Sequence, residues 1–290
     1  MNRRVAIGCT VGHDYSAFLP FVATLWRDRI GYEPTFFLVG SEIEWSAHRY
    51  AYIPYSYLIK EGFDIRFVEH IEGIEDGTIA QCVRQHAAAS DYPLDDLLIC
   101  SDADLLPIRR EFYYTHDPDK HAIGLYYSNG YDSEKDWHWP SCHYSMRVST
   151  WREVMGLDVP LAEAMRLNFS DYGLVAKMEA KRLDPAKYWG HVWFTDEFVA
   201  SKKIKASRYY IGSIHFIERE GHPPCDRLDR ACWPATYDIA GLTDCHSIRP
   251  IWNDDNWPRF RPLLQQLMPE RIAWADEYRT LFRNAMGVPR

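Results

Sequence analysis

The chain has 290 residues, of which 47% are hydrophobic and 26% are charged, a composition that excludes disordered, collagen-like and coiled-coil proteins. Its 33 Lys and Arg residues against 41 Asp and Glu residues give a formal charge of −8. This charge disfavours broad electrostatic binding to nucleic acid, which usually needs a basic surface, although a local groove stays open. The length fits one large domain or two small ones.

The apolar runs are shorter than the roughly 20 residues of a transmembrane helix. The run after Arg3 and Arg4 is cut by Gly12, His13 and Asp14, unlike a signal peptide. Seven cysteines without a C-x-x-C pair fit a reducing compartment. We therefore predict a cytoplasmic protein without a membrane span. A structural zinc site is not expected, because the cluster His222, Cys225 and Cys232 lacks a fourth ligand and a close Cys pair.

The first hundred residues alternate short apolar runs with amphipathic segments, the pattern of a parallel sheet with right-handed helical crossovers. The run at 96–100 has the apolar character of a strand buried on both faces of such a sheet. We expect strands at residues 5–9, 35–39, 63–68 and 96–100, and helices at 17–29, 46–60 and 78–89.

The second half of the chain is less regular, with strands expected at 121–127 and 143–148 and a helix starting in 149–156. From Trp257 onward the pattern predicts two helices separated by Pro269. We therefore predict an α/β fold with a mostly parallel central sheet, a Rossmann-like N-terminal half and a helical C-terminal tail. The expected division is a main domain at 1–256 and a helical extension at 257–290 that packs on it.

Ligands of open α/β sheets bind at the carboxyl ends of the strands, so the residues that follow each predicted strand are the first candidates for a site. Neither G-x-G-x-x-G nor G-x-x-x-x-G-K-[ST] occurs there. This excludes a Rossmann dehydrogenase and a P-loop NTPase.

Asp102 and Asp104 leave the end of the predicted strand at 96–100 together. The D-x-D triplet alone is not informative, because Asp117 and Asp119 form a second one in a polar turn. After a buried strand, however, paired carboxylates can hold Mg²⁺ or Mn²⁺ together with phosphate oxygens. The alternative is that Asp102 caps a turn and Asp104 caps the following helix.

The segment LLICSDADLLPI at 97–108 resembles the D-x-D segment of glycosyltransferases with the GT-A fold. The resemblance implies a GT-A-like catalytic domain, a nucleotide-sugar donor of the UDP or GDP type, and a Mn²⁺ or Mg²⁺ ion. It implies Asp104 as a direct metal ligand and Asp102 as a ligand of the metal or the ribose.

A second segment, DCHSIRPIW at 244–252, resembles the H-x-x-x-x-K-P-W type of segment in glycogenin-like enzymes. The spacing is shorter here, Arg249 replaces the Lys, and Ile251 precedes Trp252. The resemblance implies His246 as the third metal ligand and Arg249 as a contact of the diphosphate. His215, in a strand-like segment, is the rival ligand.

Asp196 and Glu197 open a helical stretch after Thr195. Thr195 as N-cap and acids in the first turn are favoured by helix capping and the helix dipole, without any catalytic role. An inverting transferase also needs a carboxylate base for the acceptor hydroxyl. The resemblance implies Asp196 as that base, with Glu197 as second choice. It favours inversion because the D-Q-D form of retaining relatives is absent.

The remaining site predictions concern the donor and the acceptor. Thr10, Asp14 and Tyr15 follow the first strand and are expected near the base and ribose, and Gln81 and Arg84 near the ribose or phosphate. Arg84 is equally consistent with a solvated helix charge. Flat rings stack on sugars, and the loop residues considered for this are Trp137, His138, Trp139, Trp189 and Trp193.

The expected acceptor is a carbohydrate or another hydroxyl compound, with a nucleic acid less favoured because of the net charge. The C-terminal helices are candidates for a homo-oligomer contact. Alternative functions are a retaining glycogenin-like transferase, a nucleotidyltransferase and a non-catalytic carbohydrate-binding module. The segment GCTVGHDYS at 8–16 lacks the basic residue that a nucleotidyltransferase usually carries in its phosphate-binding loop.

Overall fold

The computed structural model describes residues 1–131, 138–171 and 195–287. Within them, a seven-stranded sheet has the order β3-β2-β1-β4-β7-β6-β8. Strands β3, β2, β1 and β4 are parallel, β7 runs antiparallel to both neighbours, and β8 is parallel to β6. The predicted α/β fold with a mostly parallel sheet is thus confirmed. The strands are β1 (Arg3–Cys9), β2 (Glu33–Val39), β3 (Asp64–Val68), β4 (Leu97–Ser101), β6 (Ile123–Tyr126), β7 (Tyr144–Arg147) and β8 (Ile214–Ile217).

A second, three-stranded sheet joins two distant parts of the chain. Its central strand β10 (Asp244–His246) is antiparallel to β5 (Leu105–Pro107) and parallel to β9 (Arg227–Asp229). The sequence analysis did not predict these three-residue strands. Because β5 follows β4 directly, this sheet brings residues 227–246 to the carboxyl end of the main sheet.

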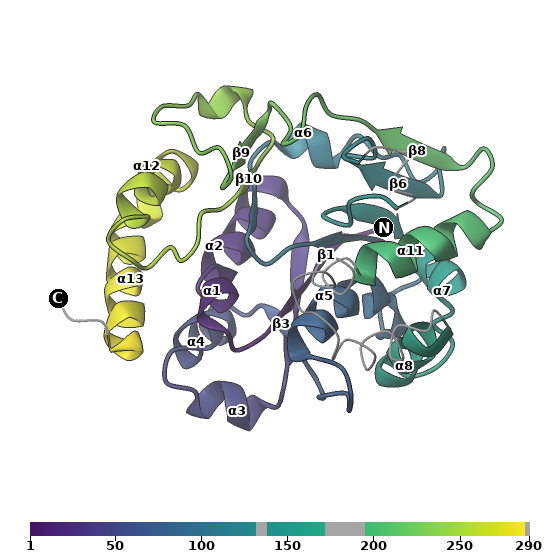
Figure 1. Ribbon diagram of the computed structural model, residues 1–290, viewed down its shortest axis with the longest axis horizontal. Coiled ribbons are helices and arrows are strands. Elements are labelled where there is room, and N and C mark those ends of the chain that lie inside the picture. Colours follow the sequence, from purple (N-terminus) through teal and green to yellow (C-terminus); the bar gives the residue numbers. More distant parts are fainter. Residues whose placement is uncertain (132–137, 172–194, 288–290) are drawn as a thin grey trace, which may run out of the picture.

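The central strands send alternate side chains to two buried cores, as the two-residue period of a strand requires. In β1, Val5 and Ile7 face one core and Ala6 faces the other. In β2, Phe36 and Phe37 divide in the same way. Helices therefore cover both faces of the sheet (Figure 1).

The first core lies under α1 (His13–Ser16), α2 (Leu19–Thr24), the π-helical η1 (Leu25–Ile30), α3 (Glu42–Ala47), α4 (Tyr52–Lys60), α6 (Arg110–Tyr113), α12 (Trp257–Leu267) and α13 (Ile272–Met286). The second core lies under α5 (Asp76–His86), η2 (Ala87–Ala89), α7 (Val148–Met155), α8 (Leu161–Asp171) and α11 (Thr195–Ala206). Two short 3₁₀ turns, η4 (Ile239–Gly241) and η5 (Pro269–Arg271), complete the described helices.

Two helix predictions need correction. The single helix expected at 46–60 is wrong: Ser41 and Glu44 form a capping box that starts α3 earlier. The backbone then leaves the helix at His48, with φ −76° and ψ 122°, before α4 begins. The helix expected at 17–29 is divided into α2 and η1, and Gly31 ends it in the left-handed conformation with φ 81°, as glycine commonly does.

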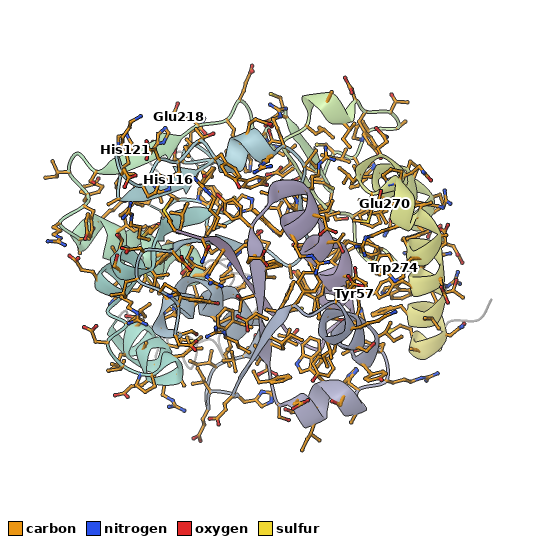
Figure 2. The ribbon with its side chains drawn as sticks, turned by 180° about the vertical axis from the view of Figure 1, so that it is seen from behind. Tyr57, His116, His121, Glu218, Glu270 and Trp274 are labelled. Atoms are coloured by element: carbon orange, nitrogen blue, oxygen red, sulfur yellow. The ribbon has the colours of Figure 1, made fainter. Side chains whose placement is uncertain are left out.

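The two predicted C-terminal helices are present and lie along one edge of the molecule (Figure 1). The ring of Phe21 in α2 contacts Phe260 of α12 and Tyr278 of α13, at centroid distances of 5.7 and 5.4 Å. Trp274 of α13 faces Tyr57 of α4 at 4.7 Å (Figure 2). These aromatic contacts bury the apolar face of the tail against α2 and α4.

Helix α5 approaches β1 unusually closely at Gly8. A Cβ atom at this position would lie 1.8 Å from the carbonyl oxygen of Ala80, so only glycine fits without a backbone shift. This contact holds Gln81 and Arg84 of α5 beside the carboxyl ends of β1 and β4.

None of the described helices combines the length and the apolar character needed to cross a membrane. All seven cysteines are free thiols.

Candidate functional site

A cavity of about 420 Å³ opens at the carboxyl ends of β1 and β4, between α5, α11 and the small sheet. Nearly all predicted site residues line it. They are Thr10, Tyr15, Gln81, Arg84, Asp102, Asp104, Asp196, Glu197 and His246. The rule that ligands of α/β sheets bind at this edge thus accounts for the location of the cavity.

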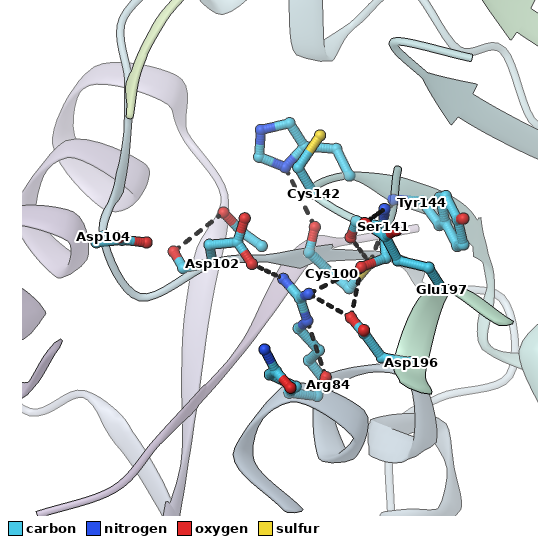
Figure 3. A network of polar contacts seen from close by, with 12 residues as sticks. Arg84, Cys100, Asp102, Asp104, Ser141, Cys142, Tyr144, Asp196 and Glu197 are labelled. Atoms are coloured by element: carbon cyan, nitrogen blue, oxygen red, sulfur yellow. Dashed lines mark hydrogen bonds and ion pairs between the residues drawn. The ribbon is translucent and has the colours of Figure 1, made fainter. Parts of the chain in front are cut away.

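Arg84 is the centre of a buried network of polar contacts (Figure 3). Its guanidinium group forms an ion pair with Asp102 and donates to Asp196 Oδ2 at 2.6 Å and to Ser141 Oγ at 2.9 Å. The Ser141 hydroxyl also donates to Asp196 Oδ2, at 2.5 Å. The Arg84 side chain is only 5% exposed, so it is not the solvated helix charge that the sequence left open.

The ionisation of Asp102 depends on this arginine. Burial by itself raises the pKa of a carboxyl group, but the positive charge of Arg84, with smaller contributions from His246 and His143, lowers the pKa of Asp102 below its ordinary value. Asp102 is therefore a carboxylate at neutral pH.

Asp104 lies among basic groups on the other side of the cavity. Its Oδ2 atom accepts from Arg230 Nη1 at 2.6 Å, and Arg249 Nε and His246 Nε2 lie 3.5 and 3.7 Å from the same oxygen. The Asp104 side chain is 3% exposed. Two guanidinium groups and one imidazole ring thus converge on one nearly buried carboxylate oxygen.

The small sheet places His246 beside Asp104, because His246 pairs with Leu105 in β5 and with Asp229 in β9. His246 Nδ1 lies 3.1 Å from Asp229 Oδ2. Burial raises the pKa of Asp229, but the hydrogen bond from His246 and other contacts hold it below its usual value. An ionised Asp229 favours the proton on Nδ1 and leaves Nε2, which faces Asp104, free as a ligand.

No group of three or more His, Cys, Asp or Glu side chains in ranges 1–131, 138–171 and 195–287 has the arrangement of a metal site. Asp104 Oδ2 and His246 Nε2 nevertheless face one another. Two protein ligands suit Mn²⁺ or Mg²⁺ when a substrate diphosphate and water supply the others. The donor set therefore fits a metal that is held jointly with a substrate.

Glu197 lies at the end of the cavity near residues 138–141. Its Oε1 atom accepts from the Tyr131 hydroxyl at 3.2 Å and from the Ser141 backbone N–H at 3.1 Å, and its Oε2 atom is 3.3 Å from His138 Nε2. Burial, with a contribution from the neighbouring Asp196, raises the pKa of Glu197 to about 7, although His138 and the Ser141 N–H oppose the rise. Glu197 therefore changes its protonation state near neutral pH.

Some predicted residues lie elsewhere. Asp14 does not line the cavity and is 2.7 Å from His13 Nδ1. His215 is in β8 at the edge of the sheet, with its ring 5.2 Å from that of His121 (labelled in Figure 2), so the structure does not bring the rival metal ligand to the cavity. Arg249 is not a lining residue either, but it contacts Asp104 and its guanidinium stacks on Tyr15 at 4.5 Å.

Of the loop aromatics considered for an acceptor, Trp137, Trp189 and Trp193 lie outside the described residues. His138 is the one described member that contacts Glu197. Trp139 instead packs near Phe216 of β8, at a centroid distance of 5.9 Å.

Sequence reasoning missed several lining residues. The signal for them in the sequence is weak: residues 218–235 form a long segment rich in Gly, Pro, Asp and Trp, and a loop of this length is typical of function or of disorder without identifying a residue. His222, from the cluster considered for zinc, lines the cavity with its Nδ1 atom 2.6 Å from the Tyr127 hydroxyl. The other missed residues include Ser141, Arg227, Asp229 and Arg230.

No protein-family model matches the chain, and no curated protein matches it. Among solved structures, it is similar to the glycosyltransferase GlyE of Streptococcus pneumoniae TIGR4, with 11% identity and a TM-score of 0.41 over 75% of this chain and 45% of GlyE. It is also similar to an active-site mutant of LgtC, with 13% identity and a TM-score of 0.44 over 92% and 95% of the two chains.

A third similar structure is the bifunctional glycosyltransferase WbbM, with 8% identity and a TM-score of 0.47 over 97% of this chain and 51% of WbbM. The chain thus spans about half the length of GlyE and of WbbM.

Proposed function

We propose that the protein is a metal-dependent glycosyltransferase that moves a sugar from a UDP- or GDP-type donor to a hydroxyl acceptor with inversion. One observation carries the proposal: a single cavity holds the facing pair Asp104 and His246 and also a carboxyl group, Glu197, that titrates near neutrality. The pair Asp104 and His246 suits a metal ion that also binds a diphosphate, and Glu197 suits proton transfer.

At the donor end, Asp104 and His246 would hold Mn²⁺ or Mg²⁺, and Asp102 is the third candidate ligand. When bound, the ion supplies positive charge that stabilises the leaving diphosphate. Asp229 orients His246 through Nδ1, and Arg249, stacked on Tyr15, adds a fixed positive charge.

The nucleoside part of the donor is assigned to the first strand end and to α5. Thr10 and Tyr15 line the cavity there and are suited to the base and the ribose. Gln81 and Arg84 of α5 also line the cavity and are suited to the ribose or the phosphates.

At the acceptor end, we assign the general base to Glu197 rather than to Asp196. Asp196 Oδ2 already accepts from Arg84 and from Ser141, so both hydrogen bonds would have to be given up before this oxygen could take a proton from the acceptor. Glu197 has a pKa of about 7, close to the value at which a base is both largely ionised and strong. The acceptor hydroxyl would transfer its proton to Glu197 as it attacks the anomeric carbon.

Replacement of Glu197 by Gln tests this assignment through the pH profile. In the wild-type protein, kcat/KM is expected to rise with pH and to level off above an apparent pKa near 7, because only ionised Glu197 accepts a proton. Glu197→Gln is expected to lower the plateau about 10²- to 10⁴-fold and to abolish that pKa. Glu153→Gln, which removes a surface partner of Arg208, is the control. A Glu197→Gln profile with the wild-type pKa would contradict the assignment.

The function itself is tested by thermal shift with UDP, GDP and their common sugars, each with Mn²⁺ and with EDTA. One nucleotide is expected to stabilise the protein only with the metal, by about 2.7 kcal/mol at a hundred times its dissociation constant. Release of free nucleotide from the matching sugar donor, with a hydroxyl acceptor present, would then demonstrate transfer. No shift with any nucleotide would reject the proposal, and stabilisation by free sugars alone would indicate a carbohydrate-binding module.

A further inference from the structure

We propose that Arg230 occupies the metal-binding oxygen of Asp104 in the ligand-free protein and moves to the donor diphosphate when metal and donor bind together. This inference rests on the proposed function and assigns a new residue to the same site. It predicts that the metal alone binds weakly, and that metal and nucleoside diphosphate bind cooperatively.

The position of Arg230 is set by the backbone of the small sheet. The Arg230 backbone N–H donates to the His246 carbonyl oxygen at 2.9 Å, so its Cα is fixed directly after β9 beside His246. Its side chain lines the cavity and is 28% exposed. The anchored backbone and the partly exposed side chain allow the guanidinium group to change partners without moving the strand.

Arg230 and a metal ion compete for the same atom. Asp104 Oδ2 accepts from Arg230 Nη1 at 2.6 Å, and this oxygen is also the one nearest to His246 Nε2, at 3.7 Å. A divalent cation between Asp104 and His246 would repel a guanidinium group at hydrogen-bond distance. Metal binding therefore requires Arg230 to leave.

Arg230 is freer to leave than the second arginine at this carboxylate. Arg249 is farther from Asp104 Oδ2, at 3.5 Å, and is held by stacking on Tyr15. In the described part of the chain, Asp104 is the one hydrogen-bonding partner of the Arg230 guanidinium group. Once displaced, this group stays in a cavity that already has to accommodate the diphosphate.

A diphosphate is the ligand that compensates for the lost ion pair. Guanidinium groups bind phosphate oxygens through paired, charge-assisted hydrogen bonds. A nucleoside monophosphate offers only the phosphate next to the ribose, so we expect it to benefit less than a diphosphate. Arg230 thereby makes tight metal binding conditional on the donor.

The test compares wild-type protein with Arg230→Gln by calorimetry, using Mn²⁺ alone, then UDP and GDP with Mn²⁺, and then UMP and GMP with Mn²⁺. Without Arg230, Asp104 Oδ2 loses its nearest cationic partner, so the affinity for Mn²⁺ alone is expected to rise about tenfold. The affinity for the nucleoside diphosphate at saturating Mn²⁺ is expected to fall about tenfold, and that for the monophosphate to change less than threefold.

Arg208→Gln is the matched control, because Arg208 pairs with Glu153 on the surface and its loss should leave all three affinities unchanged. Arg230→Lys, which keeps the charge but not the paired donors, is expected to lie between wild type and Arg230→Gln in both measurements. An unchanged or weaker affinity of Arg230→Gln for Mn²⁺ alone would overturn the inference while the proposed function stands. If the wild-type protein binds neither diphosphate with Mn²⁺, both are rejected.

Discussion

Replacing Arg84 with Met is expected to lower the free energy of unfolding by about 3–5 kcal/mol. This is the usual cost of removing one partner of a buried ion pair, because the other charge stays buried without compensation. Met fills a similar volume, but it leaves Asp102 and Asp196 without their guanidinium partner. The Asp196 side chain is 3% exposed, so water cannot replace the lost contact. Urea denaturation at pH 7 measures the change.

Arg66→Met is the matched control, because Arg66 also bridges two carboxylates, Asp64 and Asp91, but at the surface. Its loss is expected to cost no more than about 1 kcal/mol. Equal losses for the two variants would show that burial of the Arg84 network adds nothing to stability.

The effect of Arg84→Met should also depend on pH. Arg84 holds the pKa of Asp102 below its ordinary value, so its contribution is fully present above the ordinary Asp pKa of about 4. That contribution is lost as the pH falls through the lowered folded-state pKa, because a protonated Asp102 no longer attracts the guanidinium. The difference in unfolding free energy between the two proteins is therefore expected to shrink in acid.

Replacing Asp104 with Asn is expected to weaken metal-dependent binding of the nucleoside diphosphate by about 100-fold or more. Replacing a residue that only supports a metal ligand can already lower metal affinity by about 100-fold, and Asp104 is assigned to the metal itself. The substitution keeps the size of the side chain but removes the negative charge on which Arg230, Arg249 and His246 converge. The binding of UDP and GDP to the variant, with Mn²⁺ and with EDTA, measures the loss.

Asp119→Asn is the control for Asp104→Asn. Asp119 belongs to the second D-x-D triplet, but its side chain is 78% exposed and pairs with Arg147. Its replacement should leave nucleotide affinity unchanged. Wild-type affinity of Asp104→Asn for the nucleotide with Mn²⁺ would mean that Asp104 only stabilises the small sheet and its arginines.

The position of Asp102 and Asp104 could be predicted from the sequence, since both acids follow an apolar run that forms β4. The same reasoning located Thr10 and Tyr15 after β1. His246 was identified by resemblance to a known segment. Its place beside Asp104 depends on β10, a strand too short to show a period of two residues.

Arg230 and Asp229 could not be predicted in the same way. The contact between Arg230 and Asp104 spans 126 positions of the chain, and β9 has only three residues. Neither hydrophobic periodicity nor a local motif carries information on such a pairing. The length of the segment at 218–235 is typical of function or of disorder and identifies no particular residue.

Asp196 and Glu197 are neighbours in the sequence, but their surroundings in the folded protein differ. The sequence by itself determined the α/β pattern, the strand ends that form the site, and the two acids at the start of α11. Only the tertiary structure decided that Asp196 is paired with Arg84, 112 positions away, while Glu197 is buried beside His138 and titrates near neutrality. The physical reason is that ionisation depends on burial and on neighbouring charges, which the fold brings together from distant parts of the chain.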